Sequence, residues 1–126
     1  MTIKAVLLDI DGTLIDSNDY HVRAWDEAFR AAGIHFDRQT IHDQIGKGAD
    51  MLVPALLPDT DKAGQETLAA AQESAFNDRY LAQVRPFPAA RALLVRLHDA
   101  GQKLVFASSA SKEQLDHYLD LLDARA

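Results

Sequence analysis

A short apolar run that ends in two aspartates is the feature that most constrains this chain. The run Ala5–Leu8 leads directly into Asp9 and Asp11, and Gly12 follows at once. The run is too short to indicate a helix and is typical of a buried strand. In open α/β folds ligands bind at the carboxyl ends of the strands, where glycine lets the backbone turn sharply. The run therefore predicts a strand that delivers two carboxylates to the binding edge of a sheet.

Composition places the chain among ordinary globular proteins and excludes several classes. Its 126 residues are 48% hydrophobic, which is enough for one modest core. The formal net charge is −6 and the basic residues are scattered, so we expect neither nucleic acid nor a membrane surface as a partner. The absence of cysteine excludes thiol catalysis, disulfides and cysteine-bound zinc. Without a signal-peptide pattern or a long apolar run, the sequence predicts a cytoplasmic protein.

The middle of the chain has the spacing of helices. Val22, Trp25 and Phe29 recur at helical intervals, and Gly33 stands where a glycine ends a helix. We expect further helices from about 38 to 44, from 49 to 57 and from 62 towards 84, with Trp25 in their core. No segment of this stretch favours a strand.

A second strand pattern follows the helical stretch. Two prolines at 86 and 88 stop the helices. An amphipathic helix that Gly101 closes is then marked by Ala90, Leu93, Leu94 and Leu97. Lys103–Ala107 has the pattern of a buried strand, and Ser111 opens another helix with a capping box. This order predicts an α/β fold with two parallel strands in one sheet. We expect the α/β core at residues 1–16 and 86–126 and an inserted helical cap domain at residues 17–85.

Paired carboxylates at a strand end suit several kinds of chemistry. They can supply a nucleophile, a general acid or base, and oxygen ligands for a hard cation. The structural alternative is a turn that an aspartate or a serine caps locally. The combination with Thr13 and with a second strand that ends in Ser108 and Ser109 favours the functional interpretation.

The segment Asp9–Leu14, Asp-Ile-Asp-Gly-Thr-Leu, resembles the first motif of the haloacid dehalogenase superfamily. The resemblance implies a Rossmann-like core with a helical cap and a Mg²⁺-dependent phosphatase for a small phosphorylated metabolite. It implies that Asp9 is the nucleophile, which accepts the phosphoryl group as an aspartyl phosphate, and that Asp11 is the acid and base. Mg²⁺ would be held by the Asp9 carboxylate and the Asp11 main-chain carbonyl. Dehalogenase members keep no acid at the position of Asp11, because a halide leaving group needs no proton.

The same resemblance implies a phosphate site around these aspartates. Ser108 matches the second motif of the superfamily, a hydroxyl that hydrogen-bonds the transferring phosphoryl group. Ser109 is expected to be a weaker phosphate contact, and Gly12 and Thr13 are expected at the same site.

Two residues of the helical stretch also acquire roles from the resemblance. His21 resembles a cap histidine of β-phosphoglucomutase-like members and is expected to hydrogen-bond Asp11. Lys47, between two glycines, is expected to meet an anionic group of the substrate. The alternatives are an exposed histidine in a first helical turn and a solvated lysine. The remaining histidines are expected at the surface: His35, His42, His98 and His117.

Two further motifs of the superfamily, a lysine and an acidic segment, have no counterpart in the sequence. Asp116 and Asp120 have an acidic spacing but belong to an expected helix, and Lys112 stands at its start. We therefore expect a truncated chain whose open sheet edge favours self-association. Two alternatives to the phosphatase stay open: a β-phosphoglucomutase-like phosphohexomutase, and a catalytically inactive phosphate-binding or interaction fragment.

Overall fold

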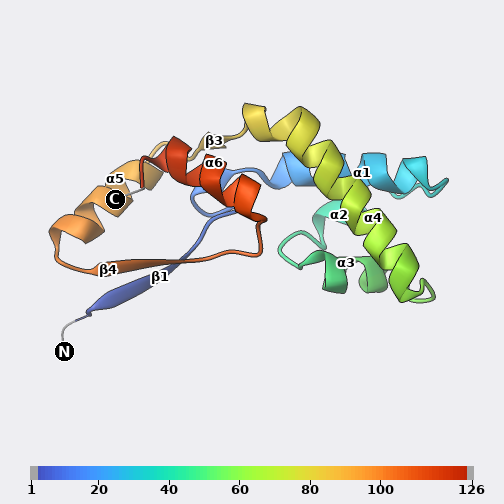
Figure 1. Ribbon diagram of the computed structural model, residues 1–126, viewed down its shortest axis with the longest axis horizontal. Coiled ribbons are helices and arrows are strands. Elements are labelled where there is room, and N and C mark those ends of the chain that lie inside the picture. The colour runs from blue at the N-terminus through green and yellow to red at the C-terminus, as the bar shows by residue number, and fades with distance from the viewer. Residues whose placement is uncertain (1–2, 125–126) are drawn as a thin grey trace. The chain divides into compact units, whose positions relative to one another are not determined.

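The computed structural model describes residues 3–124 (Figure 1). These residues form two compact units. One unit is the helical segment Asn18–Gln83, and the other combines the chain on either side of that segment. The predicted α/β fold with a helical insertion is thereby confirmed.

The α/β unit is built on a parallel pair of strands. Its elements in chain order are β1 (Ala5–Asp9), β2 (Ile15–Asp16), β3 (Arg85–Pro86), α5 (Ala90–Asp99), β4 (Lys103–Ala107) and α6 (Lys112–Leu122). β1 pairs with β4 so that Asp9 lies opposite Ala107. Because the strands are parallel, the residues that follow them emerge at the same edge of the sheet. The turn after β4 therefore lies beside the end of β1.

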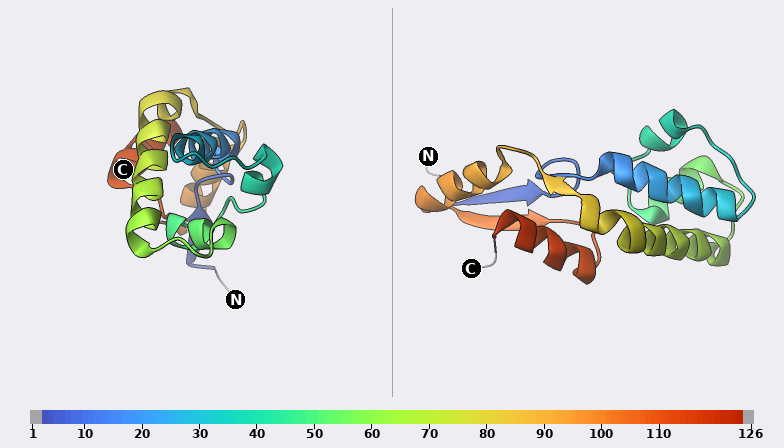
Figure 2. Two further views of the ribbon diagram at one scale, coloured as in Figure 1. Left: turned by 90° about the vertical axis from the view of Figure 1, so that its right-hand side faces the viewer. Right: turned by 90° about the horizontal axis from the view of Figure 1, so that it is seen from above.

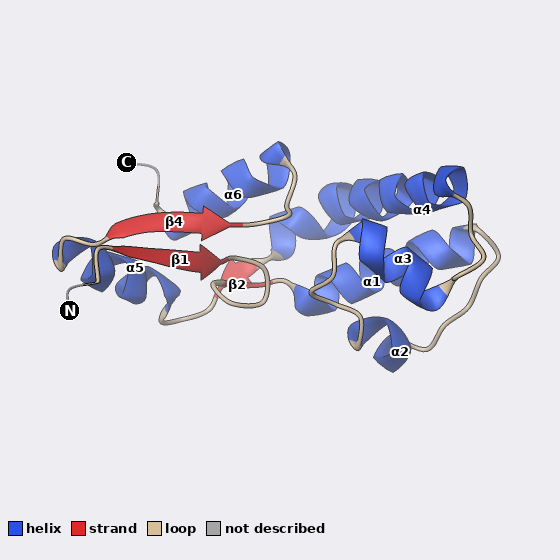
Figure 3. Ribbon diagram, turned by 90° about the horizontal axis from the view of Figure 1, so that it is seen from below, coloured by secondary structure: helices blue, strands red, loops and turns tan. Residues whose placement is uncertain are grey.

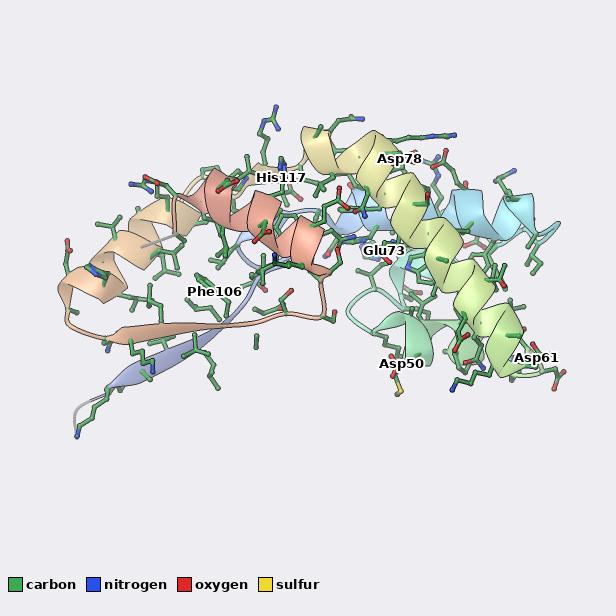
Figure 4. All side chains as sticks on the ribbon, in the orientation of Figure 1. Asp50, Asp61, Glu73, Asp78, Phe106 and His117 are labelled. Atoms are coloured by element: carbon green, nitrogen blue, oxygen red, sulfur yellow. The ribbon has the colours of Figure 1, made fainter. Side chains whose placement is uncertain are left out.

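One face of this sheet carries both helices of the unit. Figures 1 and 3 show α5 and α6 on the same side of β1 and β4. Figure 4 shows the Phe106 side chain pointing from β4 towards these helices, and its cross-strand partner Leu8 is buried. Tyr118 and Leu122 of α6 are fully buried or nearly so. The core of the unit therefore lies between the sheet and its two helices.

The short antiparallel pair β2 and β3 was not predicted. Residues Arg85–Pro86 were expected only as a break, whereas Ile15 pairs with Pro86 and the Phe87 amide donates to the Leu14 carbonyl at 2.9 Å. Proline is tolerated in such a two-residue edge strand, because the ladder does not require its missing N–H. Strands of this length have no alternation that a sequence pattern can show.

The helical unit encloses its own apolar core. Its elements are α1 (Asn18–Ala31), α2 (Arg38–His42), α3 (Ala49–Leu56), α4 (Lys62–Ala75), the π-helical turn η1 (Phe76–Tyr80) and the 3₁₀ turn η2 (Leu81–Gln83). Figure 2 shows α1 and α4 side by side. Trp25 lies in the core, as predicted, with Val22, Phe29, Ile41, Leu52, Val53 and Leu68. No helix within residues 3–124 has both the length and the apolar character that a membrane span requires.

The helical run predicted from 62 towards 84 is present, and only its first fourteen residues are α-helical. The Asp61 side chain caps α4 by accepting the Gly64 amide at 2.8 Å, but the α-helix ends at Ala75. The π-turn that follows holds an additional residue in its backbone ring, and such turns are common at functional sites. The fully buried Phe76 begins this turn. Apolar spacing alone does not distinguish a π-turn from a continuing α-helix.

Among the described residues of the α/β unit, no helix lies on the opposite face of the sheet (Figure 3). Leu7 on this face is 74% exposed, and Ile3, just before β1, is 62% exposed. β1 has only β4 as a partner strand within residues 3–124. An apolar face beside unpaired strand edges favours association with another polypeptide.

We expect the chain to self-associate through this face, and we expect Leu7→Lys to weaken the association. A lysine at that position would place a charge where the apolar surface is buried on association, which is unfavourable. Sedimentation velocity over a wide concentration range should show larger species for the wild type than for Leu7→Lys. Met51→Lys, which changes an exposed apolar residue of the helical unit, is the matched control and should behave as the wild type. A wild-type chain that stays monomeric throughout would contradict the expectation.

Candidate active site

The loop after β1 is folded tightly around one carbonyl group. The oxygen of the buried Ile10 accepts the amides of Thr13, Leu14 and Ile15 at 3.1, 2.9 and 3.0 Å. Gly12 has φ of 75°, a left-handed conformation that residues with a side chain adopt at a cost. The glycine of the motif is therefore required by the turn that places both aspartates at the sheet edge.

Asp9 ends β1 with an exposed carboxylate. Thr13 Oγ1 donates a hydrogen bond to Asp9 Oδ2 at 3.0 Å. Within the described residues no lysine or arginine forms an ion pair with this carboxylate. The tight loop thus returns a neutral hydroxyl to the carboxylate and orients it, while the group stays accessible to a ligand.

Asp11 has very different surroundings, although it lies only two residues further along. Its Oδ1 accepts one hydrogen bond from Ser17 Oγ at 2.7 Å and another from the Tyr118 hydroxyl at 2.9 Å. Ser17 and Tyr118 are both 0% exposed. The loop therefore presents one accessible carboxylate and one that two buried hydroxyls hold in place.

Ser17 and Tyr118 are the contacts that sequence reasoning missed. The local pattern around Ser17 is typical of a cap for the helix that follows, and Tyr118 lies in the apolar stripe of α6. Burial raises the pKa of Tyr118 well above its usual range, and the charge of Asp11 and the hydrogen bond to it act in the same direction. The hydroxyl accordingly stays protonated and donates. The one signal in the sequence is the hydroxyl of Tyr118 among the apolar residues of α6, because the hydroxyl of a buried tyrosine usually bonds a polar partner.

The serines after β4 lie at the same edge of the sheet as Asp9. Ser108 and Ser109 are exposed, and Ser108 Oγ accepts the Ala110 amide at 3.0 Å. That bond is the local turn role considered as an alternative in the sequence. Ser111 then caps α6 by accepting the Gln114 amide at 3.3 Å, as predicted. The phosphate contacts of Ser108, Ser109, Gly12 and Thr13 stay predictions.

His21 and Lys47 belong to the helical unit. The His21 ring stacks on Phe76, with centroids 4.0 Å apart and planes 2° from parallel, and Gln72 Nε2 lies 3.2 Å from His21 Nδ1. Lys47 Nζ donates to Gln44 Oε1 at 2.6 Å on an exposed surface. The expected hydrogen bond from His21 to Asp11 and the substrate contact of Lys47 stay predictions.

The expectation that every other histidine lies at the surface was wrong for His117. His35, His42 and His98 are exposed, whereas His117 of α6 is half-buried. Its Nε2 is buried and has no hydrogen-bond partner among residues 3–124. His117 directly precedes Tyr118 of the buried stripe of α6. A sequence pattern locates such a stripe only to within about one residue, so it does not show whether His117 is exposed.

The carboxylate loop has a donor set that suits Mg²⁺. This ion is commonly bound through one or two carboxylates together with waters and phosphate oxygens. The exposed Asp9 carboxylate and the Asp11 main-chain carbonyl can provide the protein ligands, because the two hydroxyls bind the Asp11 side chain rather than its backbone. In the described part of the chain no group of three or more histidines, cysteines, aspartates or glutamates is placed to hold a metal by itself. The residues therefore fit an ion that also needs water and substrate oxygens.

Fold and loop together define an α/β protein with a carboxylate pair at a sheet edge, and comparisons with known proteins give its family. The sequence model of the haloacid dehalogenase-like hydrolases matches residues 3–125, and the chain belongs to that family.

Similar proteins include enzymes and a solved hydrolase structure. The chain is 27% identical over 126 residues to the phosphoglycolate phosphatase of Vibrio parahaemolyticus, with 94% of this chain and 55% of that protein covered. It is 31% identical over 110 residues to the phosphoglycolate phosphatase of Vibrio cholerae, with 79% and 48% covered. A hydrolase from Pseudomonas syringae matches with a TM-score of 0.89 at 27% identity, over 98% of this chain and 57% of that one. The chain spans about half the length of the curated relatives it matches.

Proposed function

We propose that this chain carries the nucleophile and the acid–base carboxylate of a Mg²⁺-dependent phosphatase for a small phosphorylated metabolite. The contrast between Asp9 and Asp11 is the observation that carries the proposal: one carboxylate is exposed and the other is held by two buried hydroxyls. Carboxylates in unlike surroundings can take different roles in one reaction. The family and the phosphoglycolate phosphatases among its relatives support a phosphate monoester as the substrate class.

The first half of the proposed reaction transfers the phosphoryl group to Asp9. An Asp9 carboxylate oxygen attacks phosphorus, and the bond from phosphorus to the ester oxygen breaks. Asp11 gives its proton to that leaving oxygen, so an alcohol departs and Asp11 becomes a carboxylate. The product on the protein is an aspartyl phosphate at Asp9.

The second half returns the protein to its starting state. Asp11 accepts a proton from a water molecule whose oxygen attacks the same phosphorus, and the bond from phosphorus to Asp9 breaks. Inorganic phosphate leaves, Asp9 is again a carboxylate and Asp11 again carries a proton. When bound by the Asp9 carboxylate and the Asp11 carbonyl, Mg²⁺ would neutralise negative charge on the phosphoryl oxygens.

Ser108 and the start of α6 support binding of the phosphoryl group. The N-terminus of a helix presents main-chain amides and a partial positive charge, both of which favour an anion. α6 has eleven residues and begins at Lys112, just after the exposed serines at the sheet edge. His21 and Lys47 of the helical unit are proposed to contact the bound substrate.

Phosphate binding without turnover is the second candidate function. It is favoured by the absence of an ion pair between Asp9 and any lysine or arginine in residues 3–124, because a phosphorylated carboxylate gathers negative charge that a cation would stabilise. The names of the curated relatives favour a phosphatase over the phosphohexomutase.

Hydrolysis of p-nitrophenyl phosphate by the 126-residue chain tests the proposal. We expect nitrophenolate release that requires Mg²⁺ and stops when the ion is chelated. The same samples should be titrated with inorganic phosphate and followed by NMR of the Gly12 and Ser108 amides. Amide shifts without hydrolysis would overturn the phosphatase and support the second candidate. If neither hydrolysis nor amide shifts are seen, both candidate functions are overturned.

A further inference from the structure

We infer that Tyr118 is a positioning residue that, together with Ser17, determines which oxygen of Asp11 carries the transferable proton. The inference rests on the proposed acid–base function of Asp11. It assigns to α6 a part in the chemistry that no motif of the sequence indicates.

The two hydroxyls converge on a single oxygen atom. Tyr118 and Ser17 donate to Asp11 Oδ1 at 2.9 and 2.7 Å, from positions 107 and 6 residues away in the sequence. A carboxyl oxygen that accepts two donated hydrogen bonds has its lone pairs directed at those donors. In the acid form of Asp11 the proton therefore resides on Oδ2. The pair of hydroxyls selects the oxygen that gives and receives the proton.

Tyr118 is held firmly enough to fix this geometry. Its side chain is fully buried, and a rigid ring and one methylene group join its phenol oxygen to the helix backbone. The first turn of α6 is capped by Ser111, whose hydroxyl accepts the Gln114 amide. The helix is fixed at its end by Arg91, whose Nη1 donates to the Leu122 carbonyl at 3.1 Å and lies 2.9 Å from Asp123 Oδ2. A hydroxyl held in this way can fix the orientation of the Asp11 carboxylate.

The position of Tyr118 also links the two parts of the sheet edge. α6 begins just after the serine turn that follows β4. Further along the helix, its residue Tyr118 reaches Asp11 in the loop after β1. A displacement of α6 would therefore move the Ser108 turn and the Asp11 carboxylate together. This gives a physical reason for a polar contact between elements so distant in the sequence.

Hydroxyl-proton NMR of the full 126-residue chain tests the contact directly. A buried tyrosine hydroxyl bonded to a carboxylate exchanges slowly with water and resonates far downfield, so the wild type should show such a signal connected to the Tyr118 ring. We expect it to be lost in Tyr118→Phe and to move upfield in Asp11→Asn. Tyr80→Phe is the matched control, because it removes a tyrosine hydroxyl near the carboxylate of Glu27 instead of the one that bonds Asp11. A Tyr118 signal that is missing, or unchanged in Asp11→Asn, would overturn the inference.

Steady-state kinetics with p-nitrophenyl phosphate test the consequence for the reaction. Tyr118→Phe should lower kcat about tenfold, the effect of losing one hydrogen bond to a charged group, with little change in KM. Tyr80→Phe should keep the wild-type kcat. An unchanged kcat in an active, folded Tyr118→Phe would overturn the inference. If the wild type is inactive, the proposed function fails, and the NMR comparison still decides whether Tyr118 holds Asp11.

Discussion

Asp9→Asn is expected to abolish Mg²⁺-dependent hydrolysis of a phosphate monoester, with a loss of at least about 10⁴-fold in kcat. An amide oxygen is a poor nucleophile towards phosphorus, and the neutral side chain also removes a negative ligand from the proposed Mg²⁺ site. The substitution keeps the size of the side chain and an oxygen that can accept the Thr13 hydroxyl. The measurement is the release of nitrophenolate from p-nitrophenyl phosphate at saturating Mg²⁺.

Asp99→Asn is the matched control for this comparison. It makes the same chemical change at an exposed carboxylate at the end of α5, with 74% of the side chain exposed. The control should hydrolyse the substrate at the wild-type rate, and both variants should have the circular dichroism of the wild type. Turnover that persists in a folded Asp9→Asn would rule out Asp9 as the nucleophile.

Phe29→Ala is expected to lower the free energy of unfolding of the helical unit by about 3–5 kcal/mol. Phe29 is fully buried, and the centroid of its ring lies 5.5 Å from that of the Trp25 ring and 5.1 Å from that of the Phe36 ring. Truncation removes most of the apolar side chain and leaves a cavity among aromatic rings that cannot collapse fully. The chain has one tryptophan, so Trp25 fluorescence during urea unfolding reports on this unit.

Met51→Ala provides the control for that measurement. Met51 belongs to α3 of the same unit but is 60% exposed, and alanine favours the helix at least as well as methionine. We expect its urea midpoint to stay within experimental error of the wild type. A Phe29→Ala midpoint equal to that of Met51→Ala would show that the aromatic cluster does not stabilise the unit.

Much of the fold could be predicted because its elements carry local signals. β4 was predicted at its observed bounds, since an apolar run between Gly101 and the serines is typical of a strand. The start of α4 was predicted at residue 62, directly after Asp61, a residue type that commonly caps helices. The β2–β3 pair and the π-turn at Phe76 were not predicted. The first depends on contacts between segments far apart in the sequence. The second depends on tertiary packing that overrides a continuous helical pattern.

The candidate site was predictable as far as its motif extends. Asp9, Gly12 and Thr13 lie in one contiguous segment, and the parallel register places the Ser108 turn beside them. The spacing of Tyr118 in α6 is that of a buried apolar stripe, which predicts a core residue. Its bond to Asp11 joins residues 107 positions apart, and nothing in the local sequence reports such a contact.

Phosphorylation of Asp9 during turnover can be tested by mapping the position of the phosphoryl group on the chain. The chain would be mixed with p-nitrophenyl phosphate and Mg²⁺, quenched in acid to preserve the acyl phosphate, digested and sequenced by mass spectrometry. We expect one phosphoryl group on Asp9 in the wild type and none in Asp9→Asn. Hydrolysis that proceeds with the label on another residue, or with no label at all, would contradict this expectation.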